Sequence, residues 1–105
     1  MTNLNNKVAI ITGSSRGIGK AIATKLASDG ATVVINYSHS ADKANQTVEE
    51  IKQQGGNAIS LQADVSKVAD LESLFNQTID KLGQVDILIS HLAPFATSPK
   101  KPGFL

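Results

Sequence analysis

The sequence predicts an α/β protein with a partial, doubly wound parallel sheet. Short apolar runs alternate with amphipathic stretches of about a dozen residues. Within the runs apolar and polar residues do not alternate, as they would in a sheet with one solvent-exposed face. Parallel strands need right-handed crossovers, so helices are expected on both faces of the sheet. The predicted element order is β-α-β-α-β-α-β and the predicted strand order is 3-2-1-4.

The first half of the chain begins with a strand over Lys7–Thr12, where β-branched residues run into a glycine cluster. A helix over Ile18–Asp29 follows and ends at Gly30, which supplies a left-handed stop. Thr32–Tyr37 repeats the buried-strand pattern. The inward face of the helix is expected to carry Ile18, Ala21, Ile22 and Leu26.

In the second half, Ser40 is expected to cap a helix that ends at Gly55–Gly56, and Asn57–Ala63 forms the third strand. Ser66 is expected to cap a third helix ending before Gly83, and Val85–Ile89 is the fourth strand. The expected buried residues are Ala41, Ala44, Val48 and Ile51 in the second helix, and Val68, Leu71, Leu74, Phe75, Ile79 and Leu82 in the third.

The last fourteen residues break the pattern, because all three prolines of the chain fall there, at positions 94, 99 and 102. Prolines at this density block both helix and central strand. We therefore expect one half-domain over residues 1–91 and an irregular, proline-rich tail over residues 92–105.

The composition excludes several function classes. With 41% hydrophobic residues and a formal charge of +1, the chain has no polyanion-binding character, so no nucleic acid partner is expected. It has no cysteine, its two histidines stand apart, and no apolar run approaches the roughly 20 residues of a membrane span. We expect no metal, no membrane contact and a cytoplasmic location.

The segment Thr12–Gly19 is a glycine-rich turn between a predicted strand and a predicted helix. Glycines at positions 13, 17 and 19 permit a sharp turn and a close approach to a phosphate, while helix N–H groups attract the anion. A nucleoside triphosphate loop is the nearest rival, but Ser14 stands where it needs glycine and Ala21 where it needs Ser or Thr. The other alternative is a glycine turn without ligand.

These residues resemble the short-chain dehydrogenase/reductase family, whose hallmark Thr-Gly-x-x-x-Gly-Ile-Gly stands here as Thr12–Gly19. Asp64–Val65 resembles the family's adenine-contacting pair, and Val85–Ile89 resembles the strand before its Asn-Asn-Ala-Gly turn. The resemblance covers Lys7 to Ile89, is greatest to 3-oxoacyl-carrier-protein reductase-like members, and implies a Rossmann-like half-domain that binds a nicotinamide dinucleotide. The implied cofactor-binding residues are Gly13, Ser14, Ser15, Arg16, Gly17, Ile18, Gly19, Asn36, Tyr37, Ser38, Asp64, Val65 and Ser90.

The resemblance also implies NADP rather than NAD. An acid at the end of the second strand would bind the ribose hydroxyls of NAD, but Asn36, Tyr37 and Ser38 stand there. Arg16 resembles the basic residue that pairs with the 2′-phosphate in NADP-preferring members.

The resemblance ends after Ile89, where Ser90-His91-Leu92-Ala93-Pro94 replaces the Asn-Asn-Ala-Gly turn. The family's catalytic Ser and Tyr-x-x-x-Lys have no counterpart, since the single tyrosine, Tyr37, is followed four residues later by Ala41. We expect a truncated, NADP-binding portion of an oxidoreductase with no catalytic residue of its own. The alternatives are an inactive nucleotide-binding or partner-binding module, forming a homo-oligomer or pairing with a full-length relative, and a product without a biochemical role.

Overall fold

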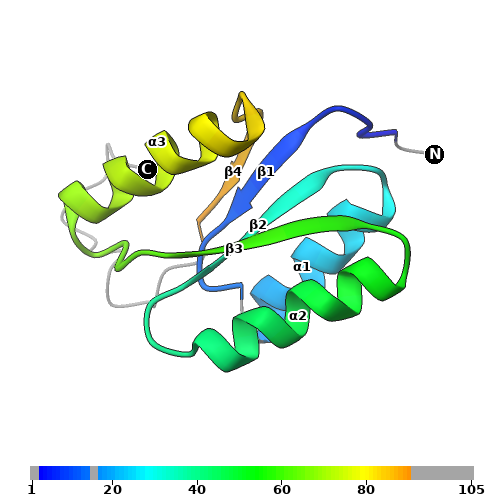
Figure 1. Cartoon of the computed structure of the whole chain (residues 1–105), viewed down its shortest axis with the longest axis horizontal. Coiled ribbons are helices and arrows are strands. Elements are labelled where there is room, and N and C mark those ends of the chain that lie inside the picture. The colour runs from blue at the N-terminus through cyan, green and yellow to red at the C-terminus, as the bar shows by residue number, and fades with distance from the viewer. Residues whose placement is uncertain (1–2, 15–16, 91–105) are drawn as a thin grey trace, which may run out of the picture.

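The computed structural model describes residues 3–14 and 17–90. Within these ranges strands and helices alternate along the chain (Figure 1), which confirms the predicted order. The elements are β1 (Val8–Ile11), α1 (Gly17–Ser28), β2 (Thr32–Tyr37), α2 (Ala41–Gln53), β3 (Asn57–Gln62), α3 (Val68–Leu82) and β4 (Ile87–Ile89). None of these helices is long and apolar enough to cross a membrane.

The strands form one parallel sheet in the order β3-β2-β1-β4, as predicted. Ile10 of β1 lies opposite Val34 of β2 on one side and Leu88 of β4 on the other. The direction of strand order therefore reverses between β1 and β4. In open α/β sheets ligands bind at the carboxyl ends of the strands beside such a reversal.

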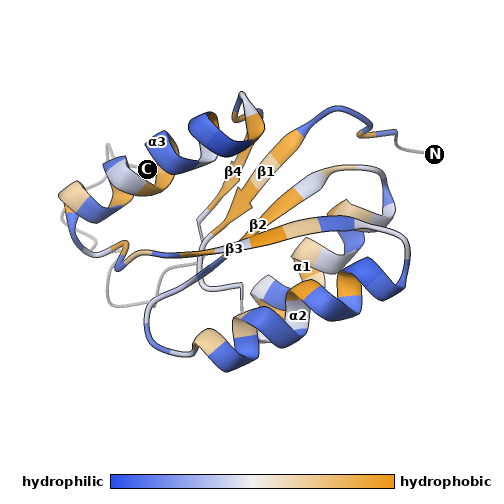
Figure 2. Cartoon of the chain, viewed as in Figure 1, coloured by the Kyte–Doolittle hydropathy of each residue, from blue (hydrophilic) through white to orange (hydrophobic). Residues whose placement is uncertain are grey.

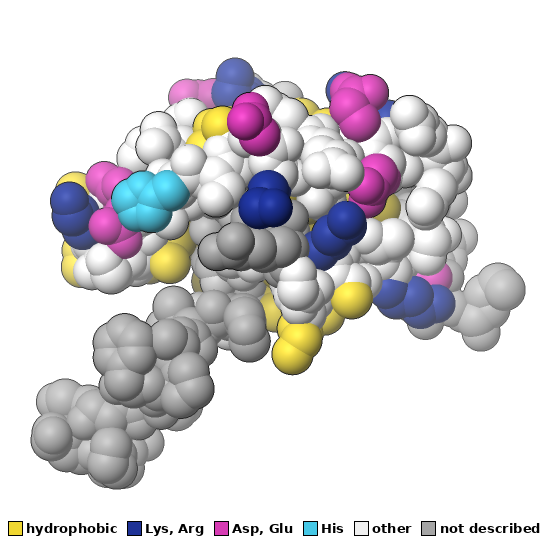
Figure 3. Space-filling view, turned by 90° about the horizontal axis from the view of Figure 1, so that it is seen from below, with side chains coloured by type: hydrophobic (Ala, Val, Ile, Leu, Met, Phe, Trp, Pro, Cys, Tyr) yellow, Lys and Arg dark blue, Asp and Glu magenta, His cyan; other side chains and the backbone are white. Residues whose placement is uncertain are grey.

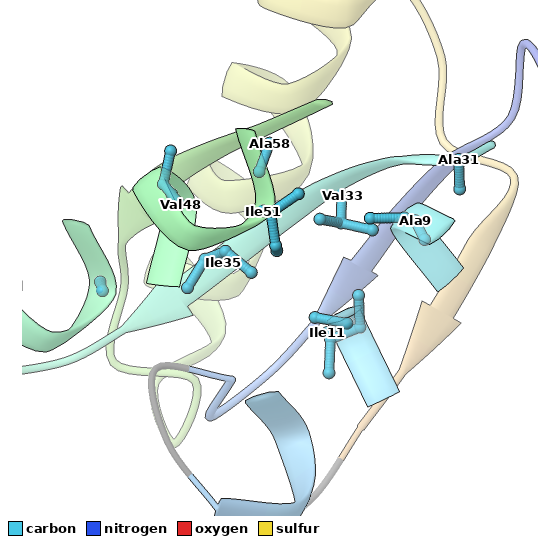
Figure 4. Packing of buried hydrophobic residues seen from close by; sticks show 11 residues of the cluster. Ala9, Ile11, Ala31, Val33, Ile35, Val48, Ile51 and Ala58 are labelled. Atoms are coloured by element: carbon cyan, nitrogen blue, oxygen red, sulfur yellow. The ribbon is translucent and has the colours of Figure 1, made fainter. Parts of the chain in front are cut away.

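The sheet lies between two helical layers: α1 and α2 cover one face and α3 covers the other (Figure 1). Successive residues of β1 point to opposite faces, so Ile11 packs in the cluster below α1 and α2 while Ile10 packs in the cluster below α3. Figure 4 shows Ile51 of α2 over Val33 and Ile35 of β2. The hydrophobic colour of Figure 2 accordingly concentrates in the strands.

The buried face of α1 differs from the prediction. Ile18 is 64% exposed and Ala21 is also exposed, while Ile22 and Leu26 are only partly buried. The buried residues are Gly19, Ala23 and Ala27. These small residues recur every four positions and let the helix lie close to the sheet, whereas our prediction favoured the larger apolar side chains.

The start of α2 is also only partly as predicted. Ser40 stands at the N-cap, but its side chain makes no capping hydrogen bond, and the backbone N–H of Ala44 bonds to the Ser40 carbonyl at 3.1 Å. The buried residues of α2 are Ala44, Thr47, Val48 and Ile51. Thr47 is buried although we did not predict it, and its hydroxyl donates to the Lys43 carbonyl at 3.0 Å. Ala41, which we assigned to the core, is only partly buried.

The third helix departs furthest from its predicted packing. Its N-cap is Lys67 rather than Ser66, and its buried residues are Leu74 and Thr78 alone. Val68 is 74% exposed and Ile79 is 48% exposed. In the described part of the chain α3 is the one helix on this face, so the outer rows of its apolar side chains remain uncovered. Likewise Leu88 of β4 is 46% exposed, although we predicted a buried strand.

Because Leu74 is buried and Ile79 is exposed, replacing each by alanine should lower the free energy of unfolding by different amounts. Leu74→Ala empties a fully buried site and should lower the free energy of unfolding by about 2–4 kcal/mol. Ile79→Ala, the matched control on the same helix, should cost less than about 1 kcal/mol. Urea denaturation measures both values, and similar losses for the two variants would contradict the packing of α3 described above.

Candidate functional site

The glycine turn begins at the carboxyl end of β1, beside the end of β4. Thr12 donates from its backbone N–H to the Ile89 carbonyl at 2.9 Å, which extends the pairing of the two strands by one residue. Gly13 (φ 61°) and Gly17 (φ 69°) adopt the left-handed backbone region that favours glycine. Ser15 and Arg16 lie outside the described residues. The structure therefore places the start of the turn at the strand-order reversal.

Gly19 lets α1 start directly against this turn. A Cβ atom at position 19 would lie 2.6 Å from the Gly13 carbonyl oxygen and 2.9 Å from the Ser14 Cα. Both neighbours are backbone atoms and have no rotamer with which to move away. Glycine is thus required here for close approach rather than for a special dihedral angle.

Ser14 points into the protein. Its side chain is fully buried, and its hydroxyl donates to the Ile11 carbonyl at 2.6 Å while accepting from the Asn36 backbone N–H at 3.0 Å. The Ser14 N–H in turn donates to the Asn36 carbonyl at 3.2 Å. Its described hydrogen bonds therefore join the turn to the end of β2. Contact between Ser14 and a cofactor stays a prediction.

Asn36 also points inward and is 2% exposed. Its side-chain oxygen accepts from the Gly13 N–H at 3.2 Å, and its amide nitrogen donates to the carbonyls of Ala63 at 3.2 Å and Leu61 at 3.4 Å. This inward orientation has no signal in the sequence, because strand alternation alone does not distinguish a buried amide from a ligand contact. Contact between Asn36 and a ribose stays a prediction.

Tyr37 and Ser38 continue from Asn36 toward solvent. Tyr37 is partly buried against the core and Ser38 is exposed. Gln62 donates from its side-chain nitrogen to the Ser38 carbonyl at 3.0 Å, which holds this backbone beside the end of β3. Ile18, at the start of α1, presents an apolar side chain that is 64% exposed.

Asp64 follows β3 and begins a small hydrogen-bonded turn. Ser66 donates to its carboxylate from the hydroxyl at 2.6 Å and from the backbone N–H at 3.0 Å, and these two bonds hold the pKa of Asp64 below its ordinary value. The Asp64 N–H bonds to the Asp70 carboxylate at 2.9 Å, a contact that sequence reasoning missed. The only signal for it is an acid in the first turn of α3.

Parallel strands bring the remaining predicted residues to the same edge of the sheet. Val65 packs partly buried against the cluster below α3, and Ser90 is exposed directly after β4. The carboxyl ends of all four strands thus contribute predicted residues to one edge. Within residues 3–14 and 17–90, no group of three or more acidic or histidine side chains is arranged to hold a metal ion.

Lys20 is the described basic residue next to the glycine turn, and it is paired with α2. Its ammonium lies 2.9 Å from the Glu50 carboxylate and holds the pKa of Glu50 below its ordinary value. Figure 3 shows acidic and basic side chains interspersed on this face of the molecule, seen from below Figure 1. Lys20 is therefore oriented by α2.

Comparison with known proteins adds independent evidence. A family model described as short chain dehydrogenase matches residues 7–93. Elsinochrome reductase 1 of Elsinoe fawcettii is 52% identical over 90 residues, which are 86% of this chain and 34% of that protein. The short-chain dehydrogenase/reductase homolog YusS of Bacillus subtilis is 45% identical over 89 residues, which are 85% of this chain and 82% of that protein.

Solved structures share the fold. A short chain dehydrogenase from Burkholderia cenocepacia J2315 in complex with NADP has a TM-score of 0.77 and 41% identity, over 83% of this chain and 36% of its own. A 7α-hydroxysteroid dehydrogenase complexed with NADH and 7-oxo glycochenodeoxycholic acid has a TM-score of 0.78 and 46% identity, over 82% of this chain and 33% of that structure. The chain thus spans about a third of these two structures and of the Elsinoe reductase.

The strand order and the position of the glycine turn define a Rossmann-like α/β protein, the class that binds dinucleotides at such an edge. The chain belongs to the short-chain dehydrogenase/reductase family, whose members are oxidoreductases that use NAD or NADP. The resemblance seen in the sequence is confirmed at this level. A special likeness to 3-oxoacyl-carrier-protein reductases stays a prediction, since the relatives named above carry other names.

The close approach of Gly19 to the turn predicts that adding a single methyl group at this position destabilises the protein. Gly19→Ala should lower the free energy of unfolding by about 2–3 kcal/mol, because the new Cβ would press on backbone atoms of the turn. Gly55→Ala is the control: a Cβ there meets open space, and the φ of 89° alone should cost about 1–2 kcal/mol. Denaturant unfolding compares them. A Gly19→Ala variant as stable as the wild type would contradict the observed packing.

The hydrogen bonds to Asp64 predict a specific titration. Its pKa is lowered in the folded state, so the bonds contribute stability above the unfolded pKa of about 3.9, and that stability is lost as the pH falls through the folded pKa. In Ser66→Ala the pKa should rise toward the ordinary value, but not fully, because the Ser66 N–H remains. Carboxyl NMR titration measures both proteins. An unchanged midpoint would show that the hydroxyl has no influence on Asp64.

Proposed function

We propose that this chain binds NADP(H) at the carboxyl edge of its sheet, as the cofactor-binding portion of a reductase that transfers hydride between NADPH and a carbonyl or alcohol. The observation that carries the proposal is the turn from Gly13 to Gly19, closed against α1 by the contact between Gly19 and Gly13. Such a turn exposes backbone N–H groups at a helix start, where the pyrophosphate of a dinucleotide is favoured.

The adenine end of the cofactor is assigned to the strand ends beyond this turn. Tyr37 and Ser38 follow the buried Asn36 and are more accessible than it, so they are the residues we assign to the ribose. Asp64 and Val65 lie at the end of the neighbouring strand, where we place the adenine ring. We assign Ile18, at the start of α1, to the pyrophosphate side of the site and Ser90, after β4, to the nicotinamide half.

Preference for NADP rests on charge at this end of the site. No carboxylate occurs in the chain between Asp29 and Asp42, so the ribose phosphate of NADP meets no acid from the end of β2. Lys20 is already paired with Glu50 at 2.9 Å. We therefore assign the 2′-phosphate to Arg16, whose guanidinium suits bidentate contact with phosphate. Similar structures bind NADP in one case and NADH in another, which supports a dinucleotide site of either kind.

Charge substitutions test this assignment. Arg16→Glu should raise the Kd for NADPH by about tenfold or more, and Ser38→Asp should do the same, because each places a carboxylate near the phosphate. The Kd for NADH should change less than about threefold in either variant. Fluorescence titration gives the constants, with Arg16→Gln and Ser38→Asn as neutral controls. Equal effects on both nucleotides would exclude a role in recognising the 2′-phosphate.

A second candidate is a nucleotide-binding module without catalysis. Tyr37 stands at the end of β2 with Ala41 four residues later, so it does not provide the family's Tyr-x-x-x-Lys. A turnover assay with NADPH and ketone substrates, run beside the titration, separates the candidates. Tight binding without turnover supports the module, which would pair with a second copy or with a longer relative.

A further inference from the structure

Asn36 is a buried polar residue at the point where three segments meet. It ends the buried part of β2, lies against the glycine turn through Gly13 and Ser14, and lies against the end of β3 through Leu61 and Ala63. Only 2% of its surface is exposed. A residue so enclosed acts on a ligand through its neighbours rather than by contact.

The hydrogen-bonding groups around this side chain suit a carboxamide. One backbone N–H, that of Gly13, faces the oxygen, and two backbone carbonyls, those of Leu61 and Ala63, face the nitrogen. A carboxylate would satisfy the Gly13 N–H but repel both carbonyls. An aliphatic side chain would leave the Gly13 N–H and the Ala63 carbonyl without the partner that Asn36 gives them.

The backbone of the same residue holds the next position of the turn. Its N–H donates to the Ser14 hydroxyl at 3.0 Å and its carbonyl accepts from the Ser14 N–H at 3.2 Å. Gly13 and Ser14 are therefore both tied to residue 36. On the other side, the Ala63 carbonyl that receives the Asn36 amide directly precedes Asp64. One residue thus connects the start of the turn with the segment that leads to Asp64.

We propose that Asn36 is a positioning residue of the dinucleotide site: it touches no part of the cofactor, but its carboxamide holds the phosphate turn and the end of β3 in a fixed relation. The role rests on the proposed function, because the turn is assigned to the pyrophosphate and Asp64 to the adenine. Discrimination between NADP and NAD then belongs to Arg16, Tyr37 and Ser38 and not to position 36.

Positioning and direct contact predict different results for Asn36→Ala. The pyrophosphate is common to NADPH and NADH, so a displaced turn should raise both Kd values by the same factor, about tenfold, equivalent to one lost hydrogen bond. A direct contact with the ribose end would change the ratio of the two Kd values. Thr78→Ala is the control, since Thr78 is equally buried and bonded to the Leu74 carbonyl but lies in α3. It should leave both Kd values unchanged.

Amide hydrogen exchange tests the same role without a ligand. In Asn36→Ala the Gly13 amide loses its acceptor and should exchange at least about tenfold faster, while the Ser14 amide, bonded to the backbone carbonyl of residue 36, should change less. Asn36→Ser is a milder second variant with the same expected pattern, which keeps the test valid if Asn36→Ala does not fold.

The outcomes separate the two proposals. If the wild-type chain binds neither nucleotide, the proposed function fails, and the exchange of Gly13 alone decides whether Asn36 holds the turn. If the wild type binds NADPH but the Asn36 variants bind as tightly, or lose only the preference between the nucleotides, the positioning role is overturned. Equal losses for both nucleotides together with faster Gly13 exchange support it.

Discussion

The fold depends on the central position of β1. Its four residues are buried on both faces, and it pairs with β2 on one side and β4 on the other. Because all neighbours run parallel to it, their carboxyl ends gather at the edge where β1 passes into the glycine turn. The turn is further fixed by the bond from Thr12 to Ile89 and by the contact of Gly19 with Gly13. The candidate site is therefore a consequence of sheet order.

The sequence was sufficient to predict this framework because the responsible signals are local. Continuous apolar runs identify buried parallel strands, and glycines after helices mark their ends, as Gly83 does with a φ of 86°. The order 3-2-1-4 is the one expected when a sheet of this kind is doubly wound and carries a glycine turn after its first strand. The position of the glycine turn after β1 needed no tertiary information either, since a strand, a turn and a helix are consecutive in the chain.

The packing of the helices required tertiary information that the pattern does not contain. Apolar periodicity assigned Ile18 and Val68 to the core, yet both are exposed. The pattern does not show which row of a helix packs on the sheet, or that α3 is the one helix on its face in the described part of the chain. In α1 the row of Gly19, Ala23 and Ala27 is buried because small residues permit a short separation. The inward orientation of Asn36 was missed because it depends on contacts between segments distant in the sequence. The partners of Asn36 lie 22 to 27 residues away from it in sequence.

The buried position of Asn36 bears on the preference between NADP and NAD. At the sequence level, the absence of an acid at position 36 favoured NADP, but the structure gives a reason for that absence which has nothing to do with the cofactor. A carboxylate facing the carbonyls of Leu61 and Ala63 would be unfavourable with or without a nucleotide. An acid that recognises a ribose must stand where the chain turns to solvent, at Tyr37 or Ser38. Neither residue is acidic, so the case for NADP rests there and on Arg16, whereas position 36 contributes to the shape of the site.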